Sequence, residues 1–107
     1  MRLGICCNPN SVEGDSLGER ALKLQGVMRE AGADYFEMGV ASVMGEDFAA
    51  LEEALRPLEM RPEAFNAFVP ATHRLTGEGV DHTRALEYCA TALERVRRIG
   101  GEVVVLG

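Results

Sequence analysis

The sequence contains no run of about 18 apolar residues, the length that a membrane-spanning helix requires. The apolar run within residues 1–7 is too short for the apolar core of a signal peptide. Cysteines are few, and Cys6, Cys7 and Cys89 have the spacing of neither a disulfide framework nor a zinc site. We therefore expect a cytoplasmic protein without a membrane partner, whose cysteines are reduced and buried as small apolar residues.

An excess of basic residues is also lacking, since 11 Lys and Arg stand against 17 Asp and Glu, for a net charge of −6. Nucleic-acid binding depends on clustered Lys and Arg that neutralise phosphates. The one basic group, residues 95–98, falls at the end of a predicted helix, where cations stabilise the helix dipole. The charge balance argues against a nucleic-acid partner and suits a small polar substrate or metal-dependent chemistry.

Low-complexity segments, linkers and phosphate-binding glycine motifs are absent as well. The composition, 47% hydrophobic and 26% charged, is ordinary for a globular protein. With 107 residues, the chain is long enough for one compact domain but is under half of the ~250 residues of a closed eight-stranded α/β barrel. We expect residues 1–107 to form a single domain or a part of one.

What the sequence does contain is an alternation of strand and helix patterns. Helices are predicted where apolar residues recur at steps of three and four, and strands where short apolar or alternating runs end at turn residues. Ser16 and Glu19 have the spacing of a capping box, Asp81 is a second helix cap, and Gly32 is a helix stop. The predicted strands cover residues 2–7, 33–40, 63–69 and 102–107, and the predicted helices cover residues 17–31, about 46–56 and 82–99.

This βαβαβαβ order predicts an α/β fold with a parallel sheet and right-handed crossovers. Two architectures fit it: the first half of a TIM (β/α)8 barrel, or a small doubly wound sheet. Glu37 shares one strand face with Tyr35 and Gly39, and Asn66 lies near the end of the third strand. Polar groups at the carboxyl ends of strands favour a barrel mouth, because burying Glu37 under helices would cost more.

Several segments carry a family resemblance that spans essentially the whole chain. They are Tyr-Phe-Glu-Met-Gly-Val at 35–40, Glu-Ala-Phe-Asn-Ala-Phe-Val-Pro at 63–70, Leu-Thr-Gly at 75–77 and Gly-Glu-Val-Val-Val-Leu-Gly at 101–107. Together they resemble the sugar phosphate isomerase/epimerase family, which has the xylose-isomerase-like TIM barrel and includes ketose 3-epimerases. The most specific piece is the Glu-Ala-Phe-Asn strand with the Pro and the Leu-Thr-Gly that follow it.

The resemblance implies the amino-terminal part of a metal-dependent isomerase or epimerase that acts on a small ketose or polyol. In that family a divalent metal (Mn, Mg, Co or Zn) polarises the substrate oxygens while paired carboxylates move a proton at the adjacent carbon. The family's metal ligands, two Glu, one Asp and one His, come from the second half of the barrel. This chain would supply none of them, so we expect it to be a partial barrel domain that binds no metal and is inactive alone.

Four residues are candidate substrate contacts, and each also has a structural interpretation. Glu37 either faces the cavity or pairs with a neighbouring cation, and Asn66 either binds a sugar hydroxyl or bridges strand ends. His73 lies in the long loop after the third strand, where barrel enzymes carry substrate contacts. Asn8 follows the first strand and either touches the site or holds a turn. No catalytic residue and no metal ligand is predicted.

The alternative function is a non-catalytic half-barrel module that self-associates. Both edge strands of such a sheet are unpaired, and Ile5, Phe65, Val104 and Leu106 are expected to face the barrel interior and to need cover. Burial of apolar surface at ~25 cal/mol per Å² favours a homodimer, or association with the missing half-barrel, over a monomer. A third possibility, the abasic-site endonuclease chemistry known on this barrel, is disfavoured by the acidic charge.

Overall fold

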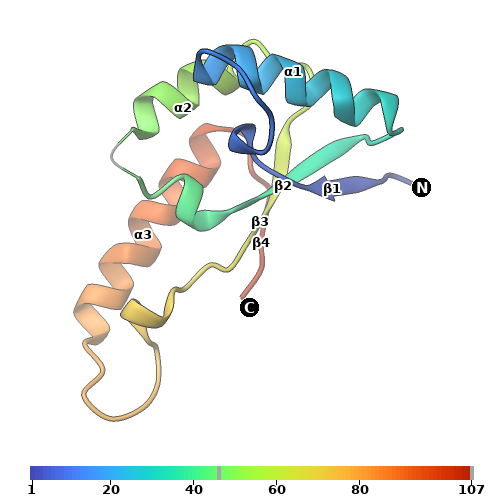
Figure 1. Ribbon diagram of the computed structural model, residues 1–107. Helices are drawn as coiled ribbons and strands as arrows, with labels where there is room; N and C mark the ends of the chain where they lie inside the picture. The colour runs from blue at the N-terminus through green and yellow to red at the C-terminus, as the bar shows by residue number, and fades with distance from the viewer. Residues whose placement is uncertain (46, 107) are drawn as a thin grey trace.

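The computed structural model describes residues 1–45 and 47–106 and shows an α/β fold with one parallel sheet (Figure 1). The strands lie in the order β1-β2-β3-β4, so chain neighbours are also sheet neighbours. The strands are β1 (Gly4–Cys6), β2 (Tyr35–Gly39), β3 (Pro62–Asn66) and β4 (Val103–Val104). The helices are α1 (Leu17–Glu30), α2 (Phe48–Leu55) and α3 (His82–Arg98), and η1 (Pro9–Ser11), η2 (Val40–Ser42) and η3 (Ala71–His73) are single 3-10 turns.

The helix boundaries follow local signals in the sequence. Ser16 caps α1, because its Oγ accepts a hydrogen bond from the Glu19 backbone N–H at 3.1 Å. The Glu19 carboxylate accepts from the backbone N–H of Asp15 at 2.8 Å, one residue earlier than the capping box predicts. Gly32 follows α1 with a φ of 80°, which glycine adopts without steric cost. Asp81 caps α3 by accepting from the Arg84 backbone N–H.

The strands are shorter than predicted, and two predicted ends lie outside the described residues. The predicted second helix was to begin at about residue 46 and the last strand to end at residue 107, and neither residue is described. Within the described ranges, none of the helices is long and apolar enough to cross a membrane. The β4 strand has two residues because only Val103 and Val104 pair with β3, opposite Ala64 and Phe65.

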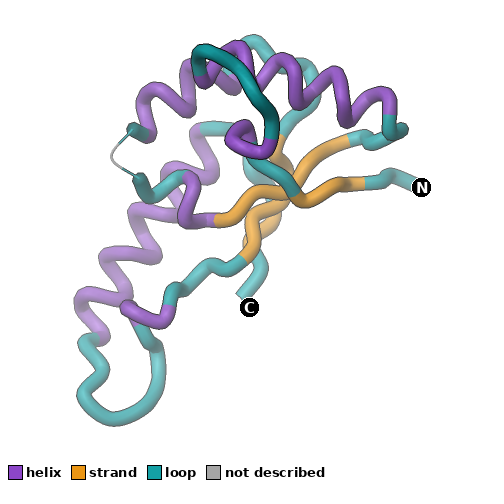
Figure 2. Tube along the Cα trace, viewed as in Figure 1, coloured by secondary structure: helices purple, strands orange, loops and turns teal. Residues whose placement is uncertain are grey.

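All three helices pack against the same face of the sheet (Figure 2). Phe36, Met38 and Phe65 point into this layer and are fully buried. One hydrophobic cluster joins them to buried side chains of every helix, among them Leu24 and Met28 of α1, Leu51 and Leu55 of α2, and Ala92 and Val96 of α3. This placement follows from the strand order, because right-handed crossovers that always step to the next strand keep their helices on one side. A doubly wound sheet instead needs a reversal of strand order.

The prediction of which apolar residues face away from the helices was wrong for three of four residues. Phe65 is fully buried beneath the helices, and Ile5 and Val104 pack against the same core. Leu106 is 69% exposed. Because β1 and β4 have apolar residues at successive positions, their sequences do not indicate which side chains meet the helices.

Candidate ligand-binding site on the open face of the sheet

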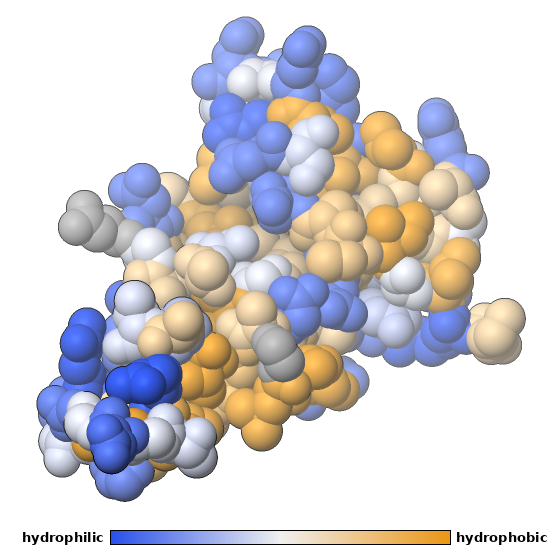
Figure 3. All heavy atoms as spheres, turned by 60° about the horizontal axis from the view of Figure 1, so that its bottom comes forward, coloured by the Kyte–Doolittle hydropathy of each residue, from blue (hydrophilic) through white to orange (hydrophobic). Residues whose placement is uncertain are grey.

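No helix covers the second face of the sheet in the part of the chain that the structure describes. We call it the open face; its side chains are those of Cys6, Tyr35, Glu37, Ala64, Asn66 and Val103, with Gly4 and Gly39 between them. Cys6 and Val103 are exposed, and the others are half-buried. Figure 3, in which the lower side of Figure 1 comes forward, shows apolar and polar side chains mixed on this side of the molecule.

Three polar side chains from three adjacent strands meet on the open face. The Nδ2 amide of Asn66 donates to Glu37 Oε1 at 2.6 Å and contacts Cys6 Sγ at 3.3 Å. The parallel register produces this meeting, since it places Cys6 beside Glu37 and Gly39 beside Asn66. We call Cys6, Glu37 and Asn66 the open-face cluster. Cys6 and Asn66 are the last residues of β1 and β3, and Glu37 is the central residue of β2. The cluster therefore lies toward the carboxyl edge of the sheet, the edge at which open α/β sheets and barrels bind ligands.

The chemistry of the open-face cluster suits hydroxyl groups. The Glu37 carboxylate accepts hydrogen bonds, the Asn66 amide both donates and accepts, and the Cys6 thiol does each weakly. The residue after Asn66, Ala67, has a φ of 51°, in the left-handed region that residues other than glycine rarely adopt. Such strained backbone is concentrated at binding sites.

A second polar layer lies on the same face toward the amino ends of the strands. The Arg2 guanidinium lies 5.1 Å from the centre of the Tyr35 ring and forms two hydrogen bonds to the Glu63 carboxylate, at 2.7 and 2.5 Å. These hydrogen bonds lower the pKa of Glu63 and raise that of Arg2. Gly4 allows the Tyr35 ring to lie against β1, because a Cβ there would be 2.4 Å from the ring. Sequence reasoning missed this layer, which joins residues 61 positions apart.

The structure does not join His73 to the open-face cluster by any contact among the described residues. The His73 ring lies 4.6 Å from the Tyr88 ring of α3, and its Nδ1 is 3.0 Å from Thr72 Oγ1. Burial raises the pKa of the Tyr88 hydroxyl. These contacts hold the loop against α3, and a role for His73 in ligand binding stays a prediction.

Asn8 has a turn-forming role in the structure. Its side chain accepts from the Asn10 backbone N–H at 2.9 Å, and its own backbone N–H donates to Ser11 Oγ at 3.4 Å. Asn8 also lines a cavity of about 270 Å³ together with Met38 and Ser42. Because Met38 belongs to the helix-covered face, this cavity is separate from the open-face cluster, and the predicted substrate contact of Asn8 remains untested.

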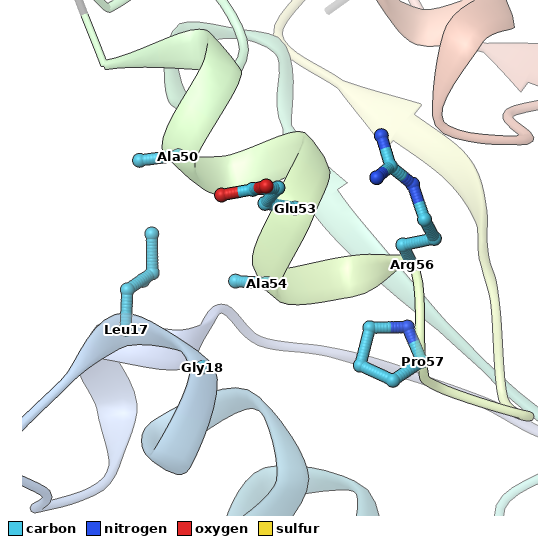
Figure 4. Close-up of a pocket in the computed structure, with 7 residues that line it drawn as sticks. All are labelled: Leu17, Gly18, Ala50, Glu53, Ala54, Arg56 and Pro57. Atoms are coloured by element: carbon cyan, nitrogen blue, oxygen red, sulfur yellow. The ribbon is translucent and has the colours of Figure 1, made fainter.

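Another cavity, of about 670 Å³, is a groove between α1 and α2 on the outside of the helix layer (Figure 4). Its walls include Leu17, Ala50 and Ala54, together with the charged Glu53 of α2 and Arg56, the residue after α2. None of the predicted site residues lines it. The groove follows from the packing of two helices, and its shape alone indicates no chemistry.

The residues present do not fit a divalent-metal site. No three His, Cys, Asp or Glu side chains among residues 1–45 and 47–106 are placed to hold a metal ion. The open-face cluster supplies only Cys6 and Glu37 as conceivable ligands, whereas catalytic metal sites use three or more protein ligands.

No family model, no curated protein and no solved structure matches this chain.

Proposed function

We propose that this chain is the first half of a (β/α)8 barrel and that its open-face cluster forms part of the wall of a site for a small ketose or polyol. The observation that carries the proposal is the hydrogen-bonded contact of Asn66 with Glu37 and Cys6. It joins the last residues of β1 and β3 to the central residue of β2, on a face that no helix covers in the described part of the chain.

In this proposal each polar residue has a distinct task. The Glu37 carboxylate accepts hydrogen bonds from ligand hydroxyls, and its contact with Asn66 fixes its position. The free carbonyl oxygen of the Asn66 amide accepts from a further hydroxyl. The amino-terminal layer of Arg2 and Glu63 lies beneath the ligand and ties β1 to β3.

The reaction proposed for the complete barrel is metal-dependent isomerisation or epimerisation. Moving a proton at a carbon beside a carbonyl requires a positioned base and stabilisation of the charge that develops. The open-face cluster contains one carboxylate and no metal site, so the metal would be held by residues outside those described here. We therefore expect the 107-residue chain to bind ligand weakly and to be inactive alone.

Ligand binding can be tested on the isotope-labelled chain by NMR titration with ketoses and their polyols. We expect shifts of the Asn66 side-chain amide and of the backbone amides of Cys6 and Glu37, and we expect Asn66→Ala to abolish them. Asn10→Ala is the matched control, because Asn10 is an exposed asparagine in η1. Shifts confined to the α1–α2 groove, or unchanged by Asn66→Ala, would contradict the proposal.

The catalytic part needs a separate assay. Epimerisation through proton abstraction incorporates solvent deuterium at the carbon beside the carbonyl, which NMR detects directly. We expect this exchange from a complete barrel that includes this chain and is assayed with added Mn²⁺. We expect no exchange from the 107-residue chain alone.

A second candidate function is a non-catalytic half-barrel module. The observation that favours it is that β1 and β4 each have one neighbour, so both edges of the sheet are free in the described residues. Absence of deuterium exchange from any assembly of this chain, with ligand binding retained, would favour this second function.

A further inference from the structure

We infer that a second copy of this chain covers the open face, with β1 of each copy lying alongside β4 of the other. This inference rests on the half-barrel part of the proposed function and concerns the 107-residue chain by itself, in which a second copy takes the place of the metal-binding half and adds no metal site among the described residues. The product is a closed, two-fold symmetric barrel of eight parallel strands.

The backbone geometry of the edges supports this pairing. On β1, Leu3 accepts from the Tyr35 N–H and the Cys7 N–H donates to Glu37, both toward β2. In a parallel ladder alternate residues bond to the same neighbour, so the N–H and C=O groups of Gly4 and Cys6 point to the free edge. Just after β4, the Val105 N–H donates to the Phe65 carbonyl, and the other edge of β4 has no partner strand in the described residues. Exposed edges of this kind invite strand addition.

The number and order of the strands allow the two paired sheets to close into a barrel. Four parallel strands in sequential order use one edge for β1 and the other for β4. Two copies related by a two-fold axis then satisfy both edges of both sheets at once. Eight strands is the number at which side chains fill the barrel interior, and a closed barrel leaves no edge for further copies.

Charge complementarity selects a second copy in this parallel orientation. The amino end of β1 carries Arg2, whose guanidinium already bonds to Glu63 of its own chain, whereas β4 is preceded by the exposed Glu102. None of the ion pairs in the described part of the chain involves Glu102. Parallel pairing brings the amino ends of β1 and β4 together, so Arg2 of one copy approaches Glu102 of the other. Pairing of two β1 edges would instead place the Arg2 guanidinium groups of the two copies together or at opposite ends of the paired strands.

The face that would be covered also exposes apolar side chains near β4. Val103 and Val105 are 54% and 45% exposed. Val103 lies on the open face. Val105 follows the core-facing Val104, so the alternation along the strand places Val105 on the open face as well. A barrel interior would bury these side chains.

The test measures the mass of the 107-residue chain in solution by sedimentation equilibrium. We expect about 23 kDa, twice the 11.6 kDa of one copy. Val105→Lys should reduce the mass to that of one copy, because it places a charge in the closed interior. Val27→Lys is the matched control: Val27 is also a half-exposed valine, at 50%, but lies on α1. Glu102→Gln should raise the dimer dissociation constant relative to Glu87→Gln, which changes the net charge by the same amount at an exposed residue of α3. Circular dichroism of each variant confirms that the monomer is folded.

A monomeric wild-type chain would overturn the inference, as would a dimer that survives Val105→Lys but dissociates with Val27→Lys. A dimer that persists in Val105→Lys as it does in the wild type would place the interface elsewhere and would equally overturn it. Failure of the dimer inference is distinguishable from failure of the ligand site. A monomer that still shows the Asn66-dependent NMR shifts would contradict the dimer and support the ligand site.

Discussion

At the scale of single residues, Asn66 determines the chemistry of the open face. Its side-chain amide contacts both Glu37 and Cys6, so one residue fixes the relative positions of groups on β1, β2 and β3. A carboxylate that accepts a hydrogen bond within the protein keeps its remaining lone pairs available for ligand hydroxyls. In the proposed site, the contact would therefore preorganise Glu37 and leave lone pairs of its carboxylate for the ligand.

The strain next to Asn66 yields a prediction. Ala67 has a φ of 51° and is exposed. A left-handed conformation costs a non-glycine residue about 1–2 kcal/mol, while glycine adds unfolded-state entropy worth about 0.4–1 kcal/mol. We expect Ala67→Gly to raise the free energy of unfolding by roughly 0.5 kcal/mol, measured by urea denaturation. Ala90→Gly, at an exposed position inside α3, should instead lower it by about 1 kcal/mol. If Ala67→Gly and Ala90→Gly lowered the free energy of unfolding equally, the backbone at Ala67 would not be strained.

The Arg2–Glu63 pair predicts a pH dependence. The hydrogen bonds from Arg2 hold the pKa of Glu63 below its ordinary value of 4.5. A carboxyl whose folded-state pKa is lowered stabilises the fold above its unfolded-state pKa, and this contribution is lost as the pH falls through the folded-state pKa. We expect Glu63→Gln to reduce the loss of Tm on acidification below about pH 4.5, by a few degrees at most because the pair is largely exposed.

The matched control is Glu87→Gln, because Glu87 is exposed and forms none of the ion pairs in the described residues. Thermal melts of both variants at several pH values supply the comparison. If the Tm of Glu63→Gln falls on acidification as steeply as the Tm of wild type, the Arg2–Glu63 pair contributes nothing to stability.

At the scale of elements, the helices were more predictable than the strands. The caps at Ser16 and Asp81 and the stop at Gly32 depend on residues within one turn, so the sequence contains their whole cause. A strand's ends depend on where its neighbour pairs, and β4 is short because only two of its residues pair with β3, Val103 with Ala64 and Val104 with Phe65. Pairing of this kind is invisible in a local window.

The candidate site was also only partly predictable from the sequence. The alternation along β2 placed Glu37 on one face and Phe36 and Met38 on the other, as the burial confirms. Cys6 was expected to be buried and is exposed, because β1 lies at the sheet edge with its open side uncovered. The contact between Asn66 and Cys6 spans 60 residues and depends on strand order, which the sequence does not state.

The contact between α3 and β3 yields the prediction at this scale. A Cβ at Gly101 would lie 2.3 Å from Cγ1 of Val96 and 2.7 Å from Cε2 of Phe65, both buried. We expect Gly101→Ala to lower the free energy of unfolding by about 1–3 kcal/mol, the usual cost of overpacking. Gly18→Ala, where a Cβ meets nothing within 4 Å, should raise it by up to about 1 kcal/mol. A neutral Gly101→Ala would show that β3 and α3 can move apart freely.

At the scale of the whole molecule, the two faces of the sheet differ in completeness. One face holds the hydrophobic cluster to which all three helices contribute. The other has a polar cluster, an ion pair and exposed valines, and two free strand edges border it. The net charge of −6 per chain opposes self-association at low salt, so a dimer must derive its stability from strand pairing and apolar burial.

This balance gives the last prediction, which concerns thermal stability. If folded chains associate and unfolded chains do not, mass action raises Tm as the protein concentration increases. We expect such a rise for wild type and for Val27→Lys, and a Tm independent of concentration for Val105→Lys. Added salt should raise the Tm of the wild-type dimer, because it screens the repulsion between two acidic chains more than it weakens the few contacts between Arg2 and Glu102. A wild-type Tm that does not change with concentration would mean that the open face is stable in water, and that the half-barrel folds without a partner.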